Sequence, residues 1–87
     1  MNKNEKELAA LYISSCLFEM RQSDMRGDSE RKEKAWNDCK KYMGRIRALL
    51  TEKFDLFGLS YEKSVDKPYR EIMQLANQMY SDRVNAA

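Results

Sequence analysis

The chain has 87 residues, of which 43% are hydrophobic and 34% are charged, and its formal net charge is +2. The hydrophobic fraction argues against disorder, while the low content of glycine (three) and proline (one) argues against a turn-rich β fold. The length fits one domain, residues 1–87, and so small a net charge does not by itself indicate a nucleic-acid partner.

The N-terminal segment MNKNEKELAALY has acidic residues where a signal peptide would have a basic head and an apolar run. No apolar run in the chain approaches the ~20 residues that a membrane-spanning helix needs. We therefore expect a cytoplasmic protein that does not associate with a membrane.

The first helix is predicted over residues 5–26. Asn4 followed by Glu7 has the spacing of a capping box, and Gly27 is the residue type that ends a helix in a left-handed conformation. A second helix is predicted over residues 29–55, with Asp28 or Ser29 as its cap. Because the turn between them is so short, the two helices are expected to pack as an antiparallel hairpin.

The second helix has the clearest amphipathic pattern in the chain. Its expected buried stripe places apolar residues three and four positions apart, namely Trp36, Cys39, Met43, Ile46 and Leu50. The third helix is predicted over residues 67–83, with Asp66 as its cap and Pro68 in its first turn. The predicted fold class is all-α: an antiparallel helical hairpin plus a third helix, forming a three-helix bundle that we expect to oligomerise.

A turn near residues 27 and 28 sets a register in which facing residues have numbers that sum to roughly 55. Cys16 then faces Cys39, and Ile13 faces Tyr42 or Met43. Two interpretations of the cysteines stay open. They are either small core residues at a close contact between helices, or a disulfide that acts as a redox latch.

The first helix has apolar residues on a second face, beside its main stripe. A chain of this length has difficulty hiding so many apolar groups, and exposed apolar patches usually mark interfaces. The alternative is that the other two helices cover both faces. We expect a protein partner and self-association, with a C2 dimer as the simplest case. The predicted partner interface consists of Leu8, Leu11, Phe18, Met25 and Leu75.

The back of the second helix is basic, with Lys40, Lys41, Arg45 and Arg47 around Gly44. These side chains would suit a phosphate or an acidic partner, although an ordinary solvated helix face has the same pattern. A glycine inside a helix costs about 1 kcal/mol relative to alanine. We therefore expect a backbone or a ligand to approach closely at Gly44.

Residues for catalysis or metal binding are scarce. The chain has no histidine and only two cysteines, and its carboxylates fall near predicted helix ends, where they act as caps. The sequence predicts no catalytic residue, no metal site and no cofactor.

The leading hypothesis is a non-enzymatic helical protein that binds another protein, as a regulator, adaptor or inhibitor of a larger complex. Small inhibitors from mobile elements have a similar composition. The alternative is a module that sequesters a nucleotide or binds nucleic acid through the basic back of the second helix. Salt dependence separates the two, because binding to phosphates weakens steeply as salt rises.

Overall fold

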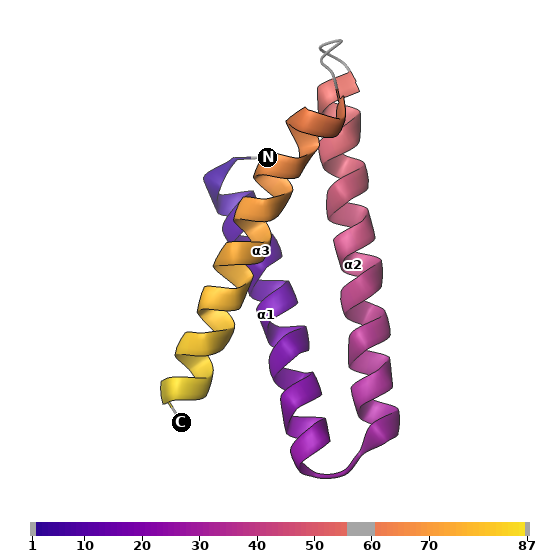
Figure 1. The fold of residues 1–87 in the computed structure, drawn as a ribbon, viewed down its shortest axis with the longest axis vertical. Coiled ribbons are helices and arrows are strands. Elements are labelled where there is room, and N and C mark those ends of the chain that lie inside the picture. The colour runs from indigo at the N-terminus through magenta and orange to yellow at the C-terminus, as the bar shows by residue number, and fades with distance from the viewer. Residues whose placement is uncertain (1, 56–60, 87) are drawn as a thin grey trace.

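A computed structural model describes residues 2–55 and 61–86, and the side chains of residues 2–51 and 67–86. These residues form three helices, α1 (Lys3–Met25), α2 (Ser29–Asp55) and α3 (Tyr61–Ala86), and no strand occurs among them (Figure 1). The predicted all-α class with three helices is confirmed, and the contacts between the helices fit a bundle.

The predicted starts of the first and third helices were wrong. α1 begins two residues early because Asn2 is its N-cap: the Asn2 side chain is 2.8 Å from the Glu5 N–H that donates to it. Asn4 therefore lies inside the helix. α3 begins at Tyr61 instead of after Asp66, so Pro68 lies within the helix and not in its first turn. Proline removes one backbone hydrogen bond there, but the helix extends on both sides of it.

The turn between α1 and α2 is closed by backbone hydrogen bonds around Gly27, which has a left-handed φ of +71°. The Asp28 N–H donates to the Ser23 carbonyl at 2.8 Å, and the Gly27 N–H donates to the Asp24 carbonyl at 3.1 Å. This is the paired pattern of a Schellman motif. The Asp28 side chain then caps α2 by accepting from the Arg31 N–H at 3.2 Å. The chain thus reverses in a few residues, and α2 returns beside α1 (Figure 1).

Three pairs of side chains that contact one another show how α1 and α2 align. The rings of Tyr12 and Tyr42 stack with centroids 4.0 Å apart, and Lys32 Nζ lies 2.9 Å from Asp24 Oδ1. The thiols of Cys16 and Cys39 are in hydrogen-bonding contact. The numbers in each pair sum to about 55, so the cysteines face one another as predicted.

α1 is the central helix, because it packs extensively against both others while α2 and α3 touch over a smaller region. Figure 1 shows why: α3 crosses α1, and its C-terminal half leans away from α2. The core is thin and rich in alanine, which lets the helices approach closely. Its buried members are Ala9, Ala10, Ile13, Cys39, Ile46, Leu50, Ile72 and Ala76.

Trp36 does not belong to this core, contrary to the predicted stripe. Its side chain is 41% exposed, whereas Cys39, Ile46 and Leu50 of the same stripe are buried. The C-terminal half of α3 diverges from α2 (Figure 1), and the indole of Trp36 remains at the surface.

Gly44 also differs from expectation. An added Cβ at this position would meet no described atom within 4 Å, so no neighbouring backbone compensates for the glycine. The expected close approach is therefore absent from the part of the chain that the structure describes.

Replacing Gly44 with alanine should raise the free energy of unfolding by about 1 kcal/mol, because alanine restricts the unfolded chain and meets no clash. For a domain of this size the melting temperature should rise by roughly 4–8 °C. Urea and thermal unfolding followed by circular dichroism measure both quantities. Gly27→Ala is the matched control and should lose about 1 kcal/mol, because its φ is positive. A destabilised Gly44→Ala variant would contradict the open environment of Gly44.

Candidate functional site

Apolar side chains remain at the surface on both sides of the contact between α1 and α2. The first surface, named here the tryptophan groove, is made of Leu17, Met20, Lys32, Trp36 and Tyr80. The second, named the tyrosine face, is made of Leu8, Leu11, Tyr12, Tyr42 and Leu49. Trp36 and Tyr42 lie three residues before and after the buried Cys39, which places them on opposite flanks of the α2 stripe.

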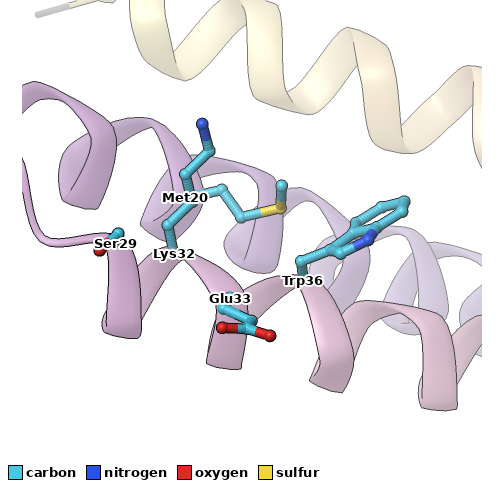
Figure 2. A pocket seen from close by; sticks show the side chains of 5 residues that line it. All are labelled: Met20, Ser29, Lys32, Glu33 and Trp36. Carbon is cyan, nitrogen blue, oxygen red and sulfur yellow. The ribbon is translucent and has the colours of Figure 1, made fainter.

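The tryptophan groove opens where α3 leans away from α2. The Met20 side chain of α1 extends toward Trp36 of α2, and Ser29, Lys32 and Glu33 complete a hollow of about 420 Å³ (Figure 2). A neighbouring hollow of about 330 Å³ shares Met20 and Lys32 and reaches Asn77 and Tyr80 of α3. All three helices therefore contribute to the two adjoining hollows, with Trp36 of α2 and Tyr80 of α3 as their aromatic residues.

The charges around the tryptophan groove leave a positive balance. Lys32 is paired with Asp24 across the lower end of the groove. Lys40 Nζ lies 5.5 Å from the centre of the Trp36 ring, a cation–π distance. Within the lining of the two hollows, Arg21 offsets Glu33 just as Lys32 offsets Asp24, so the positive balance comes from Lys40 beside the Trp36 ring.

The tyrosine face is built on the stacked pair Tyr12 and Tyr42, whose ring planes are inclined by 28°. Leu8 and Leu49 project beside it with 65% and 54% of their surfaces exposed. The nearby Ser15 hydroxyl donates to the Leu11 carbonyl at 3.0 Å. This hydroxyl is therefore already bonded within the helix, and the centre of the face consists of the leucine side chains and the two tyrosine rings.

The structure narrows the predicted partner interface. Leu8, Leu11 and Met25 are exposed, as an interface requires. Phe18 is half-buried under the Arg83 guanidinium, which lies 3.9 Å from the ring centroid, and Leu75 packs against the core. These two residues therefore connect α3 to the rest of the chain, and Tyr12 and Leu49 join the exposed set instead.

The predicted basic patch is divided between two sides of α2. Lys40 lies over Trp36, and the Arg47 guanidinium lies 5.2 Å from the centre of the Tyr69 ring on α3. Lys41 and Arg45 are exposed, and their helical positions place them on the flank that carries Tyr42. Two of the four cations thus contact aromatic rings, and the other two are exposed.

Sequence reasoning missed Trp36 as a surface residue because it fits the apolar periodicity. One signal was present. Glu33 and Lys40 lie three residues before and four residues after Trp36, so they share its edge of the helix. Charged neighbours above and below a tryptophan indicate a position at the rim of the core.

Among the described residues, no group of three or more histidine, cysteine or carboxylate side chains is placed to hold a metal ion. No helix there has the apolar run that crossing a bilayer requires. No protein-family model, curated protein or solved structure matches the chain. The function must therefore be argued from the two surfaces themselves.

The two cysteines are free thiols. Cys39 is buried and also lies 3.8 Å from the Met43 sulfur, whereas Cys16 is half-buried and lines a hollow of about 380 Å³ on the side of Tyr12. Burial raises the pKa of the Cys16 thiol, and the charges of Cys39 and Asp38 raise it further. Burial also raises the pKa of Cys39, although the hydrogen bond with Cys16 acts in the opposite direction.

Alkylation with iodoacetamide should modify Cys16 before Cys39, and both on the order of tenfold more slowly than in the urea-unfolded chain. The thiolate is the reacting form, so a raised pKa means that the folded chain's rate keeps increasing as the pH passes the ordinary cysteine pKa. Time-resolved mass spectrometry over a pH series measures this order. Equal rates for Cys39 in the folded and unfolded chains would contradict its burial.

Proposed function

We propose that this chain acts without catalysis by binding another protein, and that the tryptophan groove receives an acidic segment of that partner. The observation that carries the proposal is the exposure of Trp36 above an open, mostly apolar hollow. Exposing so large an apolar side chain has no benefit for folding, because burial of its surface would stabilise the monomer.

The composition of the groove supports this role. Tryptophan and tyrosine dominate the energetic centres of protein interfaces, and methionine adapts its shape to different partners. Trp36, Met20 and Tyr80 together line adjoining hollows large enough for one bulky apolar side chain. The antiparallel α1–α2 hairpin would serve as the rigid support for this contact.

Charge determines the kind of segment that fits best. Lys40 leaves the groove with a positive balance, so acidic residues beside the inserted apolar side chain would be attracted and basic ones repelled. The proposed role is that of a regulator, adaptor or inhibitor of a larger complex in the cytoplasm. The alternative, an anionic-ligand site on α2, has less support because Lys40 and Arg47 contact aromatic rings.

The Trp36→Ala variant should lose partner binding by roughly thirtyfold or more, as expected for the centre of an interface. The free energy of unfolding should change by less than about 1 kcal/mol, because the indole is at the surface. The measurement is affinity purification from the native host, with quantitative mass spectrometry of retained proteins. Met25→Ala is the matched control, since Met25 is exposed but lies outside both surfaces.

Retention should change by less than about tenfold between roughly 50 and 200 mM salt, whereas binding that depended on several phosphates would fall by about 10³ or more. If Trp36→Ala retained every protein that the unaltered chain retains, the tryptophan groove would not be the binding site.

A further inference from the structure

We propose that the tyrosine face binds a second copy of this chain, in a two-fold dimer that lays α1 of each copy along α2 of the other. This inference shares one premise with the proposed function, namely that exposed apolar side chains contact another protein chain. It uses the opposite flank of the α2 stripe from the tryptophan groove, so the two can fail independently.

The first observation is the separation of charge across the tyrosine face. Along α1, the stripe of Leu8 and Tyr12 carries the exposed acids Glu5 and Glu19, and the exposed base Arg26 follows at the C-cap of the helix. Among the α2 residues whose side chains the structure describes, the stripe that leads to Leu49 carries four exposed bases and one exposed acid, namely Arg31, Lys34, Lys41, Arg45 and Asp38. The acidic edge on α1 and the basic edge on α2 lie on either side of the stacked tyrosines.

A surface of this kind complements itself better than it complements a partner of one sign. An acidic protein would be attracted by α2 and repelled by Glu5 and Glu19, and a basic protein would meet the reverse problem. A two-fold axis parallel to the helices places the acidic α1 of each copy on the basic α2 of the other. An axis perpendicular to the helices would instead place α2 of each copy on α2 of the other. Their basic residues would then repel one another.

The register of the chain fixes which residues meet in this arrangement. An axis parallel to the helices keeps each residue at its own height, so Leu8 meets the part of α2 in the partner subunit that lies level with it. Facing residues sum to about 55, which puts Leu8 between Arg45 of the partner subunit and Leu49 of the partner subunit. Glu19, which lines a hollow with Lys34 of its own chain, would also lie close to Lys34 of the partner subunit, and the two tyrosine stacks would adjoin the axis.

The size of the face suits a stable dimer. α1 has 23 residues, and a helix of that length spans about 35 Å. Two adjacent helices are about 20 Å wide, so each copy offers a footprint of about 700 Å². A standard interface buries about 800 Å² per partner, with an apolar centre and a polar rim. Leu8, Tyr12 and Leu49 would form that centre, and the charged residues the rim.

The test uses two variants of the full chain, Leu8→Lys and Leu49→Glu. Both leucines are more than half exposed, so the folded monomer should accept either change. A dimer of either variant would contain two symmetry-related contacts, each with a buried and unpaired charge. Each variant alone should therefore dimerise about tenfold or more weakly. An equimolar mixture restores one Lys–Glu pair and one Leu–Leu pair, so the heterodimer should form. Sedimentation velocity and native mass spectrometry resolve these species, and Met25→Lys is the control.

The expected result is a dimeric unaltered chain, a dimeric Met25→Lys control, two single variants that dimerise about tenfold or more weakly, and a mixture that dimerises more tightly than either variant alone. A monomeric unaltered chain would overturn the inference. So would single variants that dimerise as tightly as the unaltered chain, because the contact would then use another face. A mixture that dimerises no more tightly than either variant alone would show that residue 8 does not meet residue 49 across the axis. The Trp36→Ala result is independent of all these outcomes.

Discussion

The left-handed turn at Gly27 is the constraint on which the rest of the structure depends. With φ at +71° and two backbone hydrogen bonds closing the turn, α2 has to start within a few residues of the end of α1. So short a connection allows one alignment of the two helices. That alignment stacks Tyr12 on Tyr42 and brings Cys16 against Cys39. A slip of one residue would rotate the faces of α2 by about 100° and would separate these pairs.

The three helices in the described part of the chain leave part of α2 uncovered. α3 crosses α1 and touches α2 over a smaller region, so neither flank of α2 is fully covered (Figure 1). On one flank, the gap leaves Trp36 over Met20. On the other flank, Leu49 and the tyrosine stack remain exposed beside basic residues. The thin core and the two apolar surfaces thus both result from the small contact between α2 and α3. Association with other chains would bury the apolar surface that the monomer leaves exposed.

Local patterns in the sequence were sufficient for the number of helices, the turn at Gly27 and the facing cysteines, but not for the starts of α1 and α3. Glycine conformation and periodicity act over a few residues. Local patterns were insufficient wherever the burial of a side chain depends on a helix that is distant in the sequence. Periodicity places Trp36 and Cys39 in one stripe, but the lean of α3 determines which of them is covered. In the same way, the sequence cannot show that Arg47 and Arg83 contact rings on another helix. Asn2 and Asn4 each precede a glutamate by three residues, so spacing alone does not choose between these two caps.

The central claim is that α1 and α2 meet in the register that stacks Tyr12 on Tyr42 at the surface of the hairpin. Nuclear Overhauser contacts between the ring protons of these two tyrosines, measured with selectively labelled protein, test it most directly. The account predicts strong contacts within one chain, because the ring centroids are 4.0 Å apart. Absence of those contacts, or their replacement by contacts from Tyr12 to a residue one or more positions away along α2, would contradict the register and both surfaces that depend on it.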